Sequence, residues 1–142
     1  MAKAVDEAPS QGYTGNRMGR IRKAIKVNGR ECWTLFDTGA RNTYVVPEVA
    51  VLLATSKTPR PFRSAIGGEV RETTTAALLE AEVEGHRIST HAMVIEEIGA
   101  DEEGRRLEVL FGALAMQQWG IRPVPDEERL DLSHYPEEFV EF

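Results

Sequence analysis

Two apolar runs meet at Asn28-Gly29, and this dipeptide constrains the fold more than any other feature of the sequence. Ile21, Ile25 and Val27 precede it, and an apolar run from Cys32 to Phe36 follows it. Both turn residues tolerate the positive φ that a two-residue hairpin turn needs, so the sequence predicts a β-hairpin. The second strand of this hairpin runs directly into Asp37.

Glycine-containing turns divide much of the remaining chain into short strands. Residues 62–66 and 69–75 flank Gly67-Gly68, which predicts a second hairpin with a glycine tip. A third hairpin is expected from 77–83 and 88–95, with its turn at 84–86. Further short strands are expected at 43–46, 107–111 and 129–132.

Helical signals are few. Pro47 suits the first position of a helical turn that we expect to run to Ala54. Residues 113–119 predict one short helix, which Gly120 stops. Pro123 and Pro125 exclude a central strand near the C-terminus, and residues 99–106 are expected to form a charged loop. The predicted class is therefore mostly β with one short C-terminal helix.

Composition excludes several classes of protein. The 142 residues carry a net charge of −6, which argues against a nucleic-acid partner. The basic residues between Arg17 and Lys26 are compatible with an anionic partner, but a solvated N-terminal arm or strand face is favoured. Val49–Ala54 is the longest apolar run, so no membrane partner is expected, and the N-terminus has no apolar signal segment. The single cysteine, Cys32, forbids an intrachain disulfide, and a cytoplasmic location is expected.

Most catalytic templates are absent from the sequence. There is no phosphate-binding loop, no Gly-x-Ser-x-Gly and no His-Glu-x-x-His. His86 and His91 are five residues apart, which places them on opposite faces of a strand. A metal site built from this pair is therefore not expected. Cys32 is expected to be a buried small hydrophobe.

One local group of residues suggests chemistry. Asp37 ends an apolar strand and is followed by Thr38, Gly39 and Ala40. A carboxylate at that position is costly to bury without a partner, and Gly39 permits a tight turn. Taken alone, the tripeptide favours a plain Asx turn at a strand end, because it occurs often by chance.

The surrounding sequence resembles the retropepsins, the aspartic proteases of retroviral type and their cellular relatives. The stretch from Leu35 to Val46 is similar to their catalytic loop, and Ala65–Val70 to their glycine-tipped flap. Residues 110–116, running on to Ile121, are similar to their hydrophobic-hydrophobic-Gly element and its helix. The resemblance implies a closed β-barrel over residues 20–124 and a C-terminal extension at 125–142 that contributes to a dimer interface. Residues 1–19 are expected to form a flexible lead, because they hold turn residues and no apolar period.

The resemblance also implies an aspartic endopeptidase that needs no metal and no organic cofactor. Only Asp37 is followed by Thr-Gly, so a homodimer would supply the two carboxylates, one from each chain. Asp37, Thr38 and Gly39 would be catalytic, and Ala40, Ile66, Gly67 and Gly68 would contact a polypeptide substrate. This chain has Arg41 and Ala113 where retroviral members carry an acid and an arginine that form a salt bridge.

Two other hypotheses remain open. One is a non-catalytic module with the same fold that binds peptides or dimerises without cutting. The other is a small structural β protein in which Asp37 only caps a turn. The intact Asp37-Thr38-Gly39 favours catalysis over the non-catalytic module, and the glycine tip favours catalysis over the structural β protein.

Overall fold

The computed structural model describes residues 19–141. Except for Gly19, the predicted lead at 1–19 lies outside the described residues. The same is true of Arg17 in the basic run and of the N-terminal residues that are expected to hold no signal segment. Strands dominate the described chain, which confirms a mostly β fold. The elements are β1 (Arg20–Val27), β2 (Arg30–Asp37), β3 (Tyr44–Val45), α1 (Pro47–Ala50), β4 (Ala54–Ile66), β5 (Glu69–Val83), β6 (His86–Val94), β7 (Val109–Phe111), α2 (Ala113–Trp119), β8 (Arg122–Val124), a 3₁₀ turn (Pro125–Glu127) and β9 (Arg129–Asp131).

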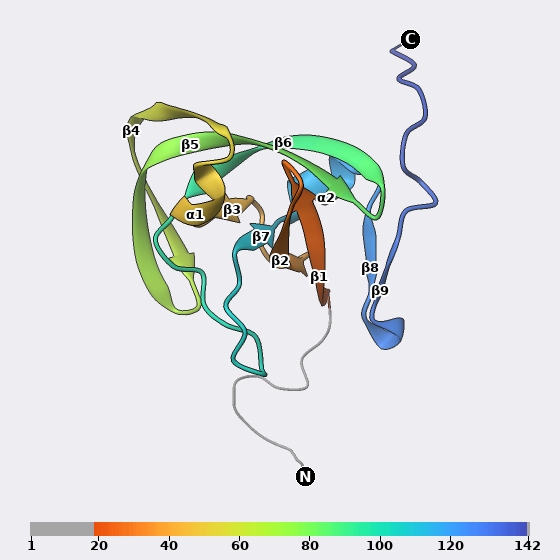
Figure 1. Cartoon of the computed structure of the whole chain (residues 1–142), viewed down its shortest axis with the longest axis horizontal. Coiled ribbons are helices and arrows are strands. Elements are labelled where there is room, and N and C mark those ends of the chain that lie inside the picture. Colours follow the sequence, from red (N-terminus) through yellow and green to blue (C-terminus); the bar gives the residue numbers. More distant parts are fainter. Residues whose placement is uncertain (1–18, 142) are drawn as a thin grey trace.

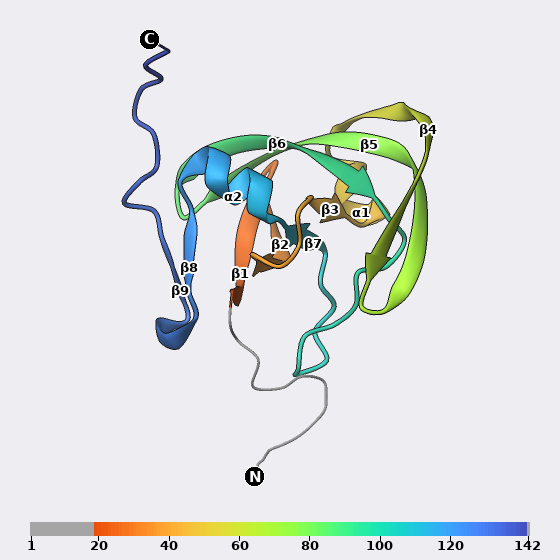
Figure 2. The same cartoon turned by 180° about the vertical axis from the view of Figure 1, so that it is seen from behind.

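Seven strands form one sheet in the order β1-β2-β7-β3-β6-β5-β4 (Figure 1). A residue pair between Lys26 and Glu82 also joins β1 to β5, so the pairings lead from β1 back to β1. The β4–β5 hairpin arches around one side of the molecule, and α2 lies against the opposite side (Figures 1 and 2). A fully closed barrel stays a prediction.

The first hairpin forms as the Asn28-Gly29 turn predicts. Asn28 has a φ of 51° and Gly29 a φ of 82°, and the strands pair from Val27 with Arg30 to Arg20 with Asp37. Alternate residues of both strands, including Ile25, Cys32 and Phe36, are buried in the core. Lys23 pairs with Glu84 across 3.1 Å and Arg22 with Glu102, so these two members of the basic run, on opposite faces of β1, have partners in their own chain.

Several segments differ from expectation: β7 begins at Val109 rather than Leu107, and the strands expected at 69–75 and 77–83 form one continuous strand, β5. The helix at Pro47 ends at Ala50, and Ala54 already belongs to β4, so the prediction of a helical turn to Ala54 was wrong. Strand β4 begins eight residues before the expected Phe62 and contains Pro59 and Pro61. The register shifts between Lys57 and Phe62, and β4 is an edge strand, which is where prolines are tolerated because they lack a donor.

The C-terminal region is an added two-stranded sheet. Helix α2 spans the expected residues and ends at Gly120, whose φ is 65°. Strand β8 passes through Pro123 and pairs with β9, so the prolines do not prevent a strand here; they confine it to a small separate sheet. The predicted strand at 129–132 is confirmed as β9. No helix within residues 19–141 is long and apolar enough to cross a membrane.

Candidate active site

Three strands from distant parts of the chain position Asp37. Strand β2 pairs in parallel with β7, matching Phe36 with Phe111, and β7 pairs antiparallel with β3. The rings of Phe36 and Phe111 lie 4.9 Å apart between centroids in the core. Because each phenylalanine is the residue before Asp37 or Gly112, the parallel register brings these two positions to the same edge of the sheet.

The loop from Asp37 to Thr43 is braced by the start of α2. The backbone N–H of Ala113 donates to the carbonyl of Ala40 at 2.7 Å, and that of Leu114 to the carbonyl of Arg41 at 3.1 Å. The first N–H groups of a helix lack partners inside it, and here the loop supplies them. These two backbone bonds hold the loop against α2 without a side-chain salt bridge between positions 41 and 113.

Gly112 permits this close approach. Its N–H donates to Thr43 Oγ1 at 3.1 Å, and a Cβ at this position would overlap the carbonyl of Asn42. The glycine is therefore required for space, since its φ of −94° is open to any residue. The hydrophobic-hydrophobic-Gly element thus acts as the support of the Asp37 loop.

The Asp37 side chain is 11% exposed, and its carboxylate has a donor on each oxygen. The N–H of Gly39 donates to Oδ1 at 2.8 Å, and Arg20 Nε donates to Oδ2 at 3.0 Å. An ionised carboxylate has roughly four lone-pair positions. Each oxygen of Asp37 therefore retains the capacity to accept a further hydrogen bond.

The other residues of the predicted catalytic motif lie at the surface. Thr38 and Gly39 are exposed, and the N–H of Thr38 donates to the carbonyl of Gly19 at 2.8 Å. Ala40 is half-buried, and its N–H donates to the carbonyl of Asp37 at 3.1 Å. The structure therefore brings Asp37, Thr38, Gly39 and Ala40 into one tight loop beside Gly19.

The second predicted group forms the tip of the β4–β5 hairpin. Gly67 and Gly68 have φ values of 60° and 82°, and both are exposed, with open space where a side chain would project. Ile66 is half-buried against the core. The tip points toward the end of the molecule where β1 begins (Figures 1 and 2). Asp37 lies at the same end, because it pairs with Arg20, the first residue of β1. Tyr44 Oη donates to Ser64 Oγ at 2.9 Å and ties the hairpin to β3.

Sequence reasoning missed Arg20 as a member of the site. The signal was present, because a two-residue turn at Asn28-Gly29 sets the register that places Arg20 opposite Asp37. No turn in the sequence predicts the Tyr44–Ser64 hydrogen bond, because Tyr44 and Ser64 do not belong to the same hairpin.

The remaining candidate groups lie apart from this loop. Within the described chain, no three His, Cys, Asp or Glu side chains are placed to hold a metal ion. The His86 ring packs against Tyr135, with centroids 4.6 Å apart, while His91 is exposed. Cys32 is fully buried, as predicted, and burial raises the pKa of its thiol, although Arg30 opposes this.

No protein-family model matches the chain, and no curated protein matches it in sequence. Among solved structures, the retroviral protease-like domain of Ddi1 from Leishmania major is 15% identical, with a TM-score of 0.57 over 80% of this chain and 88% of that one. EIAV protease, in complex with the inhibitor HBY-793, is 21% identical, with a TM-score of 0.49 over 75% of this chain and 94% of that one. The Ddi1 comparison bears on the fold alone, and it shows that this chain has a retropepsin-like fold.

Proposed function

We propose that this chain is an aspartic endopeptidase that acts as a homodimer on extended polypeptides. The observation that carries the proposal is the Asp37 carboxylate. It is nearly buried at the end of β2, accepts the Gly39 N–H, and lies in a loop braced by Gly112 and α2. A plain turn cap does not need this degree of burial and support. The C-terminal extension, now seen as β9 packed on β8, belongs to the proposed dimer interface.

In the proposed dimer, two Asp37 carboxylates lie about 3 Å apart and share one proton, because two negative charges at that distance repel strongly. The ionised carboxylate takes a proton from a water, which attacks the scissile carbonyl carbon. The protonated carboxyl donates to the carbonyl oxygen, and the roles then exchange as the tetrahedral intermediate collapses. Thr38 is assigned to a bond with the partner loop, and the Gly39 carbonyl to the substrate backbone.

The experiment is cleavage of an unfolded protein by wild type and by Asp37→Asn. Cleavage by wild type is expected to be greatest at acid to mildly acid pH, where the pair holds one proton. Asp37→Asn should lower the rate at least 10³-fold, since both proton-transfer roles are lost. Far-ultraviolet circular dichroism should show the same fold. A pepstatin-type transition-state mimic should inhibit.

Two results would reject this mechanism. One is activity that survives in Asp37→Asn, and the other is activity that a chelator removes.

The ion pair between Arg20 and Asp37 favours a second candidate, a non-catalytic peptide-binding or dimerisation module. An arginine 3.0 Å from the carboxylate suits a structural role for Asp37. Under that candidate, Asp37→Asn would lower the melting temperature and leave peptide binding intact, and wild type would cut nothing.

A further inference from the structure

Arg71 is the unusual residue on the β4–β5 hairpin. Its Nε is buried, and among the described residues no group is placed to accept its hydrogen. Its Nη2 lies 3.4 Å from Glu69 Oε1, and its side chain is 25% exposed while that of Glu69 is 69% exposed. A buried donor without an acceptor costs free energy, and the exposed quarter of the side chain is the part that an acceptor from outside the chain can reach.

The register of the hairpin shows which way Arg71 faces. Arg71 lies opposite Ser64, and the neighbouring pairs Phe62–Thr73 and Ile66–Glu69 lie on the same face because side chains alternate along a strand. Ser64 on this face accepts the hydrogen bond from Tyr44 on β3. Arg71 therefore belongs to the inner face of the hairpin, which covers the strand that follows the Asp37 loop.

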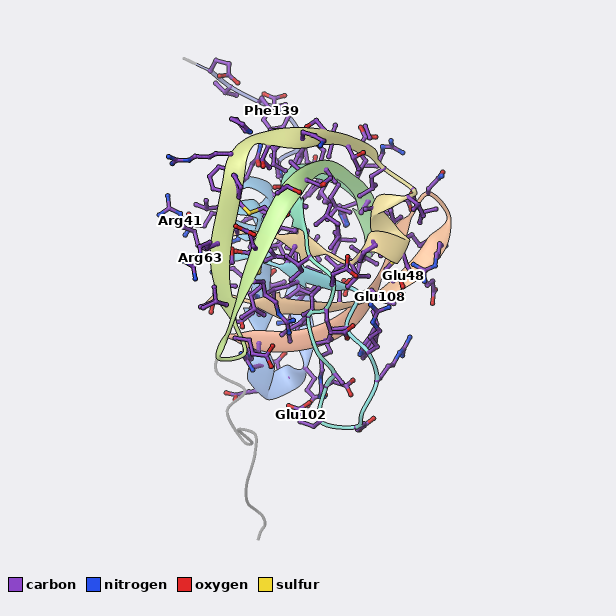
Figure 3. The ribbon with its side chains drawn as sticks, turned by 90° about the vertical axis from the view of Figure 1, so that its left-hand side faces the viewer. Arg41, Glu48, Arg63, Glu102, Glu108 and Phe139 are labelled. Atoms are coloured by element: carbon purple, nitrogen blue, oxygen red, sulfur yellow. The ribbon has the colours of Figure 1, made fainter. Side chains whose placement is uncertain are left out.

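The opposite face carries a matched arginine. Arg63 lies opposite Glu72, one residue pair from Ser64 and Arg71, and both residues are exposed. In Figure 3 the side chain of Arg63 projects outward from the ribbon. The hairpin thus presents one arginine inward and one outward at adjacent positions.

We infer that Arg71 is a specificity-determining residue that binds an acidic side chain of the peptide substrate. This inference rests on the proposed function, because it takes the inner face of the hairpin as one wall of the peptide site. A carboxylate is the acceptor that best matches a guanidinium, since it accepts two parallel hydrogen bonds and carries the opposite charge.

The position of Arg71 also limits where the acidic residue lies in the substrate. Arg71 is three residues from Gly68, which is about 10 Å along a strand at about 3.3 Å per residue. If the hairpin tip covers the bond that is cut, an extended peptide reaches Arg71 within about three residues of that bond. In a homodimer the same selection applies on both sides of the cut.

The test compares two sets of decapeptides that share an apolar central pair. One set carries Glu and the other Gln at each of the three positions on either side of the centre. Binding to the Asp37→Asn variant is measured by fluorescence anisotropy, and cleavage by the wild type is measured by mass spectrometry. The best Glu peptide is expected to bind about 10- to 100-fold more tightly than its Gln partner, which is the range of a charged hydrogen bond.

Three variants assign the preference to Arg71. Arg71→Gln should remove it, and Arg71→Glu should reverse it toward peptides that carry Lys. Arg63→Gln, the matched change on the outer face, should leave it unchanged.

Equal binding of Glu and Gln peptides by a protein that retains Arg71 would overturn the inference. So would equal weakening of both sets by Arg71→Gln, which would mean that Arg71 binds a backbone carbonyl or only supports the hairpin. Failure of the proposed function looks different: wild type would cut neither set, while the anisotropy preference would still depend on Arg71.

Discussion

Asp101 orders the loop between β6 and β7 through its side chain. Its Oδ1 accepts the N–H groups of Glu103 and Arg105, and its Oδ2 accepts Trp33 Nε1 at 2.8 Å. The Arg105 guanidinium stacks over the Trp33 ring at 4.0 Å. Desolvation by itself raises the pKa of the Asp101 carboxyl, but the bonds from Trp33, Arg105 and Glu103 outweigh it and the pKa lies below its usual value. One carboxylate therefore joins this loop to β2, the strand that ends at Asp37.

This pKa shift predicts that the loop loosens in acid. A carboxyl whose pKa is lower in the folded state stabilises the fold above its unfolded pKa of about 3.9, and the stabilisation is lost as pH falls through the folded pKa. In a Trp119→Phe background, Trp33 fluorescence should therefore change below about pH 4. Asp101→Asn should abolish this titration and cost about 1–2 kcal/mol at pH 7. An unchanged titration in Asp101→Asn would assign the transition to another group.

Strand β5 carries two similar turns at its ends with different surroundings. Gly67-Gly68 precedes it at the proposed site, and Glu84-Gly85 follows it at the other end, with Gly85 at a φ of 84°. Neither Gly68 nor Gly85 has an atom within 4 Å of the place where a Cβ would stand. Both glycines are therefore required for backbone conformation, and the two ends of β5 form a matched pair for mutation.

Replacing Gly67 and Gly68 with valine should strain the tip by about 1–3 kcal/mol per residue, because β-branched residues disfavour positive φ. If the hairpin is a flap, kcat/KM should fall at least tenfold while the dimer persists. Gly85→Val imposes the same kind of strain away from the site, so it should lower the melting temperature with kcat/KM per folded molecule retained. Two results would mean that the segment is not a flap. One is a double variant that cuts as well as wild type, and the other is hydrogen exchange in 62–72 that is as slow as in the core strands.

The whole chain supplies one half of the proposed site. The described residues contain a single Asp-Thr-Gly loop, and the added β8–β9 sheet stands apart from the seven-stranded sheet (Figure 1). The C-terminal segment also packs on the domain: Tyr135 Oη donates to the Arg87 carbonyl, and a Cβ on Gly120 would overlap the His134 carbonyl. In the proposed two-carboxylate mechanism, a second copy of the chain supplies the other Asp37.

Sedimentation at micromolar concentration should give a mass of about twice 15.8 kDa. Proteolytic activity per chain should fall on dilution in parallel with the dimer fraction, because the site is incomplete in one copy. A strict monomer at high concentration would leave no route to a pair of carboxylates, and the endopeptidase proposal would fail.

The sequence by itself determined the local elements of this protein. The φ requirements at Asn28-Gly29 and Gly67-Gly68 predict two hairpins, and the helix at 113–119 begins and ends where expected, because these signals act between neighbouring residues. The register of the first hairpin even contains the pairing of Arg20 with Asp37.

Only the tertiary structure decided the contacts between segments. The parallel pairing of β2 with β7 joins two strands that no single turn connects. It brings Gly112 to the Asp37 loop from 75 positions away. Strand β4 starts early because Ala54–Lys57 pair with residues 75–78 of β5, beyond a shift in register that no turn signal marks. Such pairings leave no local pattern, because a parallel register depends on which apolar faces the whole chain buries together.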